Sequence, residues 1–572
     1  MSAQKITRPK RNFLPEEFTI NSWESIETYF KDLNIRSINS VEELKKWLHD
    51  KSELEAVLSE DMGWRYIKMT CDTTNQSLTD SFTFFVENIE PNIAPYSNEL
   101  NKKLIASPFI SMLDQNLYKV YLRGVKNALE IYREENIPLL TKLSVESQKY
   151  AAITGAMTIE WKGEKITMQK AWSYLKDVDR NVREQVFQLI QKRRSEDQDK
   201  LNDLFSELIK LRHQVAFNAG FKNYRDYKFA ELGRFDYTVA DCFSFHDSIA
   251  KEILPLAEAS SLERKNLLKL DSLRPWDNDV DVESKPALHP FNTSEDLITK
   301  SIECFKNVRP AYADVLETMK TMGHLDLESR IGKAPGGYNY PLYEIGLPFI
   351  FMNSVGAHRD LVTMVHEGGH AIHSVYTKDL EITDFKSFPS EVAELASMSM
   401  ELISMEHWDV FFTDADELKR AKKEQLQDAL KTLLWIAAVD KFQHWIYENP
   451  EHTAEERMKG WENVISNFSS KVVDWIGIED VRSRTWQNQL HIFEVPFYYI
   501  EYGMAQLGAF AVWRNYKQNP QNALDNYEAA LKLGYTKSIH EIYRTAGIEF
   551  NFSQSYVREL ALFVKRELDK LG

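Results

Sequence analysis

Cysteine is scarce in this chain: three residues in 572, at positions 71, 242 and 304. Their number is odd and they lie far apart, so they form neither a disulfide framework nor a CxxC metal knuckle. This usage is typical of a reducing compartment, and we expect a cytoplasmic location. The N-terminal residues carry positive charge, but no apolar stretch follows them, so a secretory signal is not expected.

Long apolar runs and long basic runs are also missing. No run of about eighteen apolar residues occurs, so no membrane-spanning helix is expected. Acidic residues outnumber basic ones, 86 to 70, and the formal net charge is −16. Nucleic-acid binding needs a basic face that displaces counterions, and no long Lys/Arg run provides one. We therefore expect neither nucleic-acid nor membrane partners.

Helical periodicity dominates the pattern that is present. Residues 168–217 contain neither proline nor glycine, and their apolar residues recur at spacings of three and four. The sequence therefore predicts a mainly α protein. Residues 157–168 differ, since their alternation predicts a β-hairpin that turns at Lys162 and Gly163. Residues 336–352 are rich in glycine, proline and aromatics, which predicts a loop with short strands.

The most informative motif follows those short strands. His366-Glu367-Gly368-Gly369-His370 has the H-E-x-x-H pattern, which places two histidines one helical turn apart on the same face. Both can bind one metal ion, and Glu367 lies beside them to accept a proton from activated water. The preceding strand either pairs with an extended peptide or only braces this helix, and both interpretations stay open.

A third ligand is predicted on the next helical segment. Glu391, Glu394 and Glu401 fall nearly on one helical face, among Val, Ala, Leu and Met residues. Carboxylates on an apolar stripe are costly unless a cation meets them, and a metal ion would do so. Glu394 follows His366 closely enough for a helix–loop–helix return to bring them together. Spacing also makes Glu391 a candidate for orienting a ligand histidine.

Two further features of the motif need an explanation. Glycine costs a helix about 1 kcal/mol relative to alanine, so Gly368 and Gly369 indicate that a neighbouring element or a substrate approaches the backbone. His373 continues the face of His370. A fourth ligand would close the position that a catalytic site keeps open, so we interpret His373 as a supporting or core residue.

These segments resemble the M3 family of zinc metallopeptidases, which includes thimet oligopeptidase. Beyond the motif with Glu394, the sequences at 219–227, 234–238, 273–277, 348–353 and 491–502 resemble its oligoendopeptidase F branch. The resemblance implies a helical, elongated zincin body with a deep central channel and a small β-sheet next to the H-E-x-x-H helix. It also implies an N-terminal helical domain with the β-hairpin over residues 1–195 and a catalytic domain over residues 196–572.

The same resemblance implies one zinc ion per chain, bound by His366, His370 and Glu394, with Glu367 as the general base. The matching C-terminal stretch offers His491, Tyr498 and Tyr502 to stabilise the oxyanion. Thimet-type members have a glycine-rich loop here and this chain has none before Gly503, so Tyr499 also stays a candidate. The implied activity is endopeptidase cleavage of short, unstructured oligopeptides.

Three other functions are alternatives to this one. A zinc aminopeptidase commonly has a G-x-M-E-N element that holds the free amine, and the sequence contains none. A carboxypeptidase-like exopeptidase stays an alternative. A non-catalytic, peptide-binding helical protein is disfavoured because a structural zinc site has no need of Glu367. Blocked peptides separate an endopeptidase from these exopeptidases.

Overall fold

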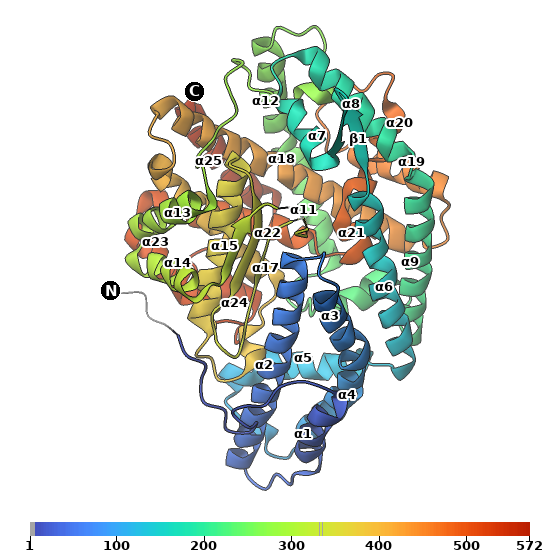
Figure 1. The fold of residues 1–572 in the computed structure, drawn as a ribbon, viewed down its shortest axis with the longest axis vertical. Helices are drawn as coiled ribbons and strands as arrows, with labels where there is room; N and C mark the ends of the chain where they lie inside the picture. Colours follow the sequence, from blue (N-terminus) through green and yellow to red (C-terminus); the bar gives the residue numbers. More distant parts are fainter. Residues whose placement is uncertain (1–5, 331, 335) are drawn as a thin grey trace. The chain divides into compact units, whose positions relative to one another are not determined.

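The protein is described here from a computed structural model that covers residues 6–330, 332–334 and 336–572. Helices make up most of it and the sheets are small, which confirms the predicted mainly α class (Figure 1). Within the described residues, no helix is both long enough and apolar enough to cross a membrane.

Contacts divide the chain into two units, and each is assembled from three chain segments. The first unit contains residues 1–132, 288–422 and 505–550, and the second contains residues 133–287, 423–504 and 551–572. The domain boundary expected near residue 195 stays a prediction, since a division by contacts does not test it.

The first unit contains the following helices and strands. They are α1 (Trp23–Ile35), α2 (Val41–Cys71), α3 (Gln76–Asn88), α4 (Glu90–Ala106), α5 (Gln115–Ile131), α13 (Ser294–Val308), α14 (Pro310–Met322), β3 (Leu325–Glu328), β4 (Tyr338–Tyr340), β5 (Phe349–Ser354), α15 (His358–Thr377), α16 (Thr383–Lys386), α17 (Ser390–Ser404), α23 (Pro520–Leu531) and α24 (Ile539–Thr545). Short 3₁₀ turns lie at Ile110–Met112 and Met405–Val410.

The second unit is also mainly helical. Its elements are α6 (Ile137–Gly155), β1 (Thr158–Trp161), β2 (Glu164–Thr167), α7 (Met168–Ser173), α8 (Arg180–Ser195), α9 (Gln198–Asn218), α10 (Tyr224–Glu231), α11 (Val239–Glu252), α12 (Leu254–Leu267), α19 (Ala454–Ile465), α20 (Glu479–Ser483), α21 (Leu490–Glu494) and α25 (Gln554–Leu571), with 3₁₀ turns at Glu134–Asn136, Tyr174–Lys176, Pro275–Asp277 and Thr485–Asn488. Two helices, α18 (Ala415–Glu448) and α22 (Ile500–Gln518), contribute residues to both units.

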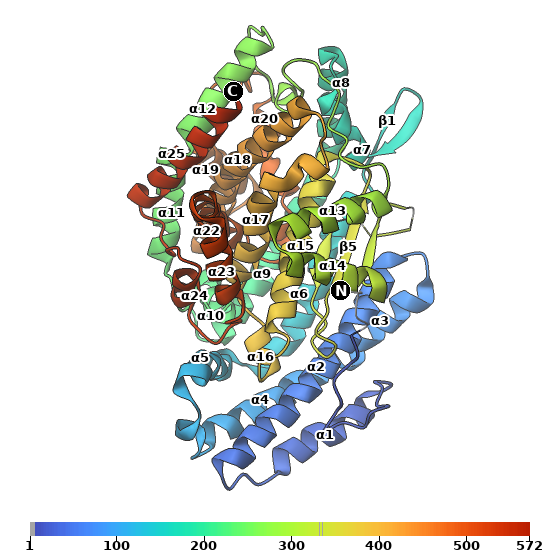
Figure 2. The same cartoon turned by 90° about the vertical axis from the view of Figure 1, so that its left-hand side faces the viewer.

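Both strand predictions are confirmed. β1 and β2 form an antiparallel hairpin in which Trp161 pairs with Glu164. Lys162 and Gly163 both have positive φ, 52° and 83°, as a tight two-residue hairpin turn requires. In the first unit, β5, which Figure 2 labels, pairs with parallel β3 on one side and antiparallel β4 on the other, so β4 is an edge strand.

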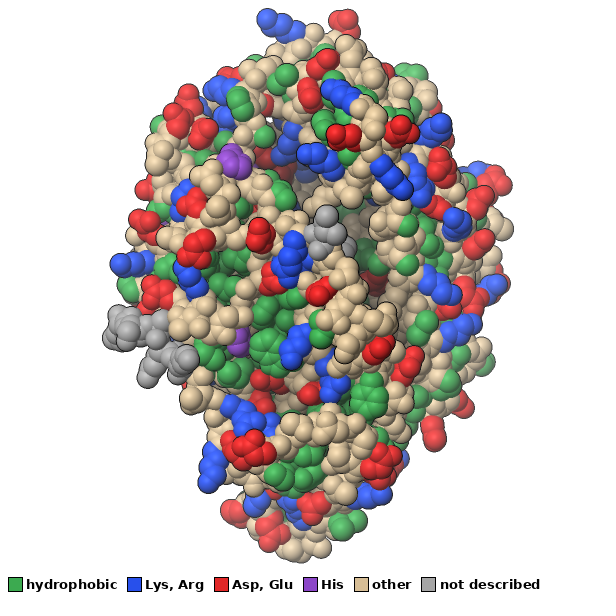
Figure 3. All heavy atoms as spheres, in the orientation of Figure 1, with side chains coloured by type: hydrophobic (Ala, Val, Ile, Leu, Met, Phe, Trp, Pro, Cys, Tyr) green, Lys and Arg blue, Asp and Glu red, His purple; other side chains and the backbone are tan. Residues whose placement is uncertain are grey.

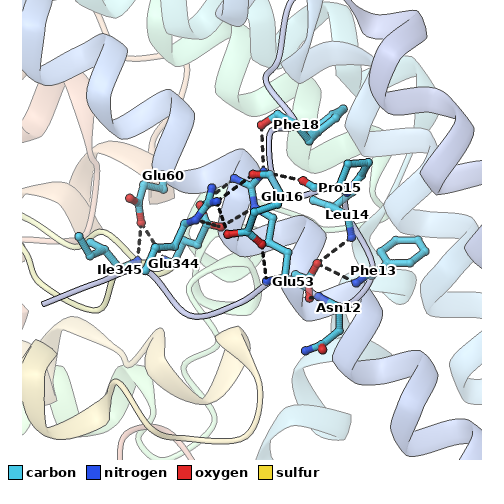
Figure 4. A network of polar contacts seen from close by, with 12 residues as sticks. Asn12, Phe13, Leu14, Pro15, Glu16, Phe18, Glu53, Glu60, Glu344 and Ile345 are labelled. Carbon is cyan, nitrogen blue, oxygen red and sulfur yellow. Dashed lines mark hydrogen bonds and ion pairs between the residues drawn. The ribbon is translucent and has the colours of Figure 1, made fainter.

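Two carboxylates on α2, those of Glu53 and Glu60, fasten two irregular segments of the first unit. Glu53 accepts hydrogen bonds from the backbone N–H groups of residues 12–14, at 2.8–3.0 Å (Figure 4). Glu60 accepts from the N–H groups of Glu344 and Ile345, in the loop before β5. Arg11 then joins the two segments through its ion pair with Glu344, at 2.6 Å. These contacts hold Glu344 and Ile345 in place, in the loop that leads into β5.

Charges of the two signs are mixed on the surface. On the face drawn in Figure 3, Lys and Arg side chains lie among Asp and Glu side chains, with no wide basic area. This agrees with the net negative charge of the sequence.

Candidate metal centre

The candidate centre is carried by two neighbouring helices of the first unit, α15 and α17 (Figure 1). α15 follows β5 after a short turn, and Asp360 in its first turn accepts hydrogen bonds from the N–H groups of Val355 and Ala357. These bonds satisfy backbone donors that a helix start leaves unpaired. The H-E-x-x-H motif therefore begins two turns into a well-anchored helix.

The two glycines of the motif let neighbouring helices come close. A Cβ atom at Gly369 would lie 2.7 Å from Cα of Ser397 and 2.9 Å from the carbonyl oxygen of Ala396, both on α17. A Cβ atom at Gly368 would lie 2.6 Å from the Phe305 ring of α13. Packed helices, rather than a substrate, are therefore the approach that these glycines permit.

Three predicted ligands converge across this contact. His366 Nε2 lies 3.3 Å from Glu394 Oε2, and His370 Nε2 lies 3.6 Å from the same oxygen. One donor atom from each residue falls within 4.8 Å of the others. Two imidazoles and one carboxylate are a donor set that zinc binds in catalytic sites. The residues present therefore fit such an ion.

Two more side chains hold these donors in place. Glu401 Oε1 lies 2.6 Å from His366 Nδ1, so that nitrogen donates a proton to the carboxylate and Nε2 faces Glu394. Ser397 Oγ donates to Glu394 Oε2 at 2.9 Å. A carboxylate behind a ligand histidine fixes its tautomer and orientation. Glu401 provides this contact, while an orienting role for Glu391 stays a prediction.

The protonation states also suit a metal. Burial lowers the pKa of His370 to about 4, so its ring is neutral. Burial opposes ionisation of Glu394, yet the two histidines and Ser397 lower its pKa to about 2. His366 differs: burial lowers its pKa, but Glu394 and Glu401 on either side raise it well above its usual value. The pair of carboxylates thus attracts one positive charge to this point.

Glu367 interacts electrostatically with His366, Glu394 and Glu401 but is not one of the three donors. It is nearly buried, and burial, helped by the negative charges of Glu394 and Glu401, raises its pKa to about 7. Its backbone carbonyl accepts a hydrogen bond from the Asn339 side chain of β4, at 3.2 Å. Edge strand β4 is therefore attached directly to the motif helix.

His373 is a core residue, as interpreted from the sequence. Its side chain is completely buried, and its ring stacks on Phe388 with the centroids 3.6 Å apart. Burial lowers its pKa to about 3, so it remains neutral.

The other predicted residues gather in the second unit. The ring of His491 lies 4.8 Å from that of Tyr499, 5.9 Å from Tyr502 and 6.0 Å from Tyr498, measured between centroids. Tyr502 also contacts Tyr498 and Tyr499. The structure therefore brings the four rings together, and Tyr499 belongs to the cluster as much as Tyr498 does.

Two residues that the sequence analysis did not identify, Trp435 and Gln489, determine the tautomer of His491. Trp435 Nε1–H donates to Gln489 Oε1 at 2.7 Å, which identifies that atom as the amide oxygen. Gln489 Nε2 therefore donates to His491 Nδ1, at 2.6 Å. In a neutral ring the proton then sits on Nε2. In the sequence, the only signal for this contact is that Gln489 lies two residues before His491.

Models of two protein families match the chain. The model of peptidase family M3 matches residues 173–562, more than half of the chain, and that of the peptidase M3 N-terminal domain matches residues 13–132. An oligoendopeptidase F homolog of Borreliella burgdorferi is 22% identical over 454 residues, which cover 77% of this chain and 75% of that protein. Oligopeptidase PepF of Bacillus subtilis is 22% identical over 413 residues, 71% of this chain and 60% of that protein.

Solved structures share the fold over nearly the full length. PZ peptidase A, solved with an inhibitor, has a TM-score of 0.90 at 26% identity, and the match covers 97% of this chain and 99% of that one. An X-ray structure assigned as an oligoendopeptidase F also has a TM-score of 0.90, at 25% identity, over 97% and 98% of the two chains.

Proposed function

This chain belongs to peptidase family M3, and from that membership we propose that it is a zinc-dependent oligoendopeptidase whose metal is bound by His366, His370 and Glu394. The observation that carries the proposal is the convergence of these three donors on one point beside Glu367. The neutral imidazole of His370, the imidazole of His366 once the ion displaces its proton, and the ionised carboxylate of Glu394 match what zinc requires. The location proposed from the scarce, scattered cysteines is the cytoplasm.

Zinc held by His366, His370 and Glu394 would supply a Lewis acid that polarises the scissile carbonyl and makes water a stronger acid. The Glu367 carboxylate accepts the proton of the attacking water and returns it to the leaving amine nitrogen. A group with a pKa near 7 is suited to both transfers at neutral pH, and a bound cation shifts this pKa downward and so favours acceptance. Glu401 and Ser397 keep the donors aligned meanwhile.

Strand β4 is the proposed support for the peptide. An edge strand offers backbone N–H and C=O groups that an extended peptide can pair with. Asn339 attaches this strand to the backbone of Glu367, so a peptide paired with β4 would run alongside the catalytic carboxylate. Such pairing uses hydrogen bonds to the peptide backbone and not to its side chains, so it suits unstructured oligopeptides of varied sequence.

The oxyanion is proposed to be stabilised by His491 Nε2–H together with a hydroxyl of Tyr498 or Tyr502. The hydrogen bonds from Trp435 to Gln489 and from Gln489 to His491 support this, because they leave the histidine proton on Nε2. Tyr499 is the alternative hydroxyl, since its ring lies nearest to that of His491.

Peptides blocked at both ends test the proposal. An internally quenched peptide with an acetylated N-terminus and an amidated C-terminus is expected to be cut internally, to resist cutting after chelation, and to be cut again after zinc is added. Cleavage only of peptides with a free amine would instead identify an aminopeptidase, and a requirement for a free carboxylate would identify a carboxypeptidase. No cleavage at all would favour a peptide-binding protein.

Replacing Gln489 with Leu is expected to lower kcat about fivefold to tenfold while zinc content stays unchanged. The loss corresponds to one hydrogen bond, about 1 kcal/mol, that selects the tautomer of His491. Steady-state kinetics and metal analysis of the same sample measure it. Trp435→Phe is the matched control, which keeps the amide and removes only its anchor, so its effect should be smaller. An unchanged kcat in Gln489→Leu would remove His491 from the proposed mechanism.

Zinc affinity is expected to rise with pH by about tenfold per unit below the raised pKa of His366. The ion must displace the proton that Glu394 and Glu401 hold on this ring, so binding releases a proton. Competition with a chelator between about pH 6 and pH 8 measures the slope. In Glu401→Gln the pKa of His366 falls, and the slope should flatten. Equal slopes in the two proteins would contradict this assignment.

A further inference from the structure

A second group of metal-binding side chains lies in the second unit, on α11 and α18. Each helix carries two of them, four residues apart: Cys242 and His246 on α11, Asp440 and His444 on α18. This spacing places both members of a pair on the same helical face. Within the described residues, Cys242, Asp440 and His444 are one of two such groups whose donor atoms lie within 4.8 Å of each other.

The fourth residue joins the group through Asp440. His246 Nε2 lies 2.8 Å from Asp440 Oδ2, and His444 Nε2 lies 3.2 Å from the same oxygen. One carboxylate oxygen is therefore shared by two imidazoles from different helices, whereas Glu394 Oε2 in the first unit is shared by two imidazoles of one helix.

All four side chains are removed from solvent. Cys242, His246 and Asp440 are 0% exposed, and His444 is 1% exposed. Aromatic rings surround them, with Phe243 at 4.9 Å, Phe497 at 5.3 Å and Phe229 at 6.0 Å from the His444 ring. A carboxylate in such apolar surroundings is costly unless a cation neutralises it.

Hydrogen bonds and ion pairs within the protein satisfy only part of this group. Asp440 Oδ2 contacts one nitrogen of each histidine. Among the described residues, His246 Nδ1, Asp440 Oδ1 and His444 Nδ1 have no hydrogen-bond partner, although all three are buried. Buried polar atoms in a folded core are almost always paired. Two histidines and an aspartate that only braced the core would be expected to form a satisfied network.

The charge states fit metal binding as well. Burial opposes ionisation of Asp440, yet His444 and His246 hold its pKa well below the usual range, so it is a carboxylate. Burial lowers the pKa of His246, so its ring is neutral. Carboxylate and neutral imidazole are the forms that bind metal ions.

We propose that Cys242, His246, Asp440 and His444 form a second, structural metal site for a divalent ion of the zinc class. One thiolate, two imidazoles and one carboxylate give four donors, the number that closed tetrahedral zinc sites have. Sulfur and nitrogen donors select zinc over magnesium or calcium. Binding releases the Sγ–H proton of Cys242 to solvent, and the thiolate and carboxylate together neutralise the doubly charged ion.

The geometry needs only small adjustments. Bonds of about 2.0 to 2.3 Å in a tetrahedron place donor atoms about 3.4 to 3.8 Å apart. The donors of Cys242, Asp440 and His444 are already within 4.8 Å of one another, so shifts of about 1 Å bring these three atoms to that spacing. His246 Nε2 lies 2.8 Å from Asp440 Oδ2 and would move away from it to become the fourth donor. The ion would join two helices whose ligands are 194 residues apart in the chain.

Metal content tests the proposal directly. The full-length protein is stripped with chelator, reloaded with zinc, freed of excess metal and analysed by inductively coupled plasma mass spectrometry. Two zinc ions per chain are expected in the wild type, one in Cys242→Ser, one in His370→Ala and none in the double variant. Cys242→Ser changes one atom, so the fold should survive even if a change at Asp440 disrupts it. One ion in the wild type that Cys242→Ser retains would overturn the proposal.

Cobalt gives a second readout that is independent of catalysis. Co²⁺ bound to a thiolate shows a charge-transfer band in the near ultraviolet, and the centre on α15 and α17 contains no thiolate. The band is expected in the wild type and in His370→Ala, and should be lost in Cys242→Ser. Its absence from the wild type, or its survival in Cys242→Ser, would show that the group is a metal-free hydrogen-bonded cluster. A failure of the peptidase proposal would leave these spectra unchanged.

Discussion

Replacing Glu367 with Gln is expected to lower kcat by about 10²- to 10⁴-fold while zinc stays bound. The amide keeps the size of the carboxylate but cannot accept the proton of the attacking water, and general base catalysis contributes about this much. Glu367 is not among the three convergent donors, so the metal affinity should change little. Rates with a blocked peptide and zinc analysis of the same preparation measure both quantities.

Asp360→Asn is a suitable control for this variant. Asp360 accepts hydrogen bonds at the start of the same helix, so its loss should reduce stability without a comparable loss of kcat. A Glu367→Gln protein that holds zinc and retains full kcat would rule out the proposed proton transfer. Equal losses in the two variants would indicate damage to α15 rather than to the chemistry.

Replacing Gly369 with Ala is expected to weaken zinc binding by about 10- to 100-fold, the usual scale for disturbed support of a ligand. The new methyl group would overlap backbone atoms of Ser397 and Ala396, so α17 must shift and carry Glu394 with it. Overpacking of this kind costs about 1–3 kcal/mol, more than the gain of about 1 kcal/mol from the better helix former. Chelator competition and thermal denaturation measure the two effects.

Gly368→Ala separates folding from metal binding. Its methyl group would overlap the Phe305 ring of α13 and leave the contact between α15 and α17 intact. Both variants should be less stable than the wild type, but only Gly369→Ala should lose zinc affinity. Equal zinc affinities in the two variants would contradict the role of Gly369 in placing Glu394.

The sequence predicted what depends on spacing within one segment. The helical spacing of His366 and His370, the turn at Lys162 and Gly163, and a carboxylate on the following helix all have local signals. The structure confirms the hairpin and brings Glu394 to the two histidines. The sequence left open whether a neighbouring helix or a substrate approaches Gly368 and Gly369. The structure answers this, because only the folded protein shows which helices pack against them.

Contacts between distant segments had no such signal. The sequence placed Glu401 on the correct face, but which carboxylate meets His366 depends on how α17 crosses α15. Trp435 orients Gln489, which in turn contacts His491. Trp435 and Gln489 are 54 residues apart in the chain, so no periodic pattern in the sequence predicts their hydrogen bond. Cys242 and Asp440 each begin a pair at helical spacing, yet nothing in either pair indicates that the two helices meet.

Because the first unit is built from three separate chain segments, it can finish folding only after the last of them has been synthesised. Tyr527 and Tyr543 donate hydrogen bonds to the carbonyls of Ala396 and Glu391 on α17, but they follow them by 131 and 152 residues. At about 5–20 residues per second, α17 leaves the ribosome about 7 to 30 seconds before these tyrosines exist. Until then the helix that carries Glu394 lacks part of its permanent surroundings. Zinc capture is therefore expected to be a late event in the life of the nascent chain, after residue 550 has emerged.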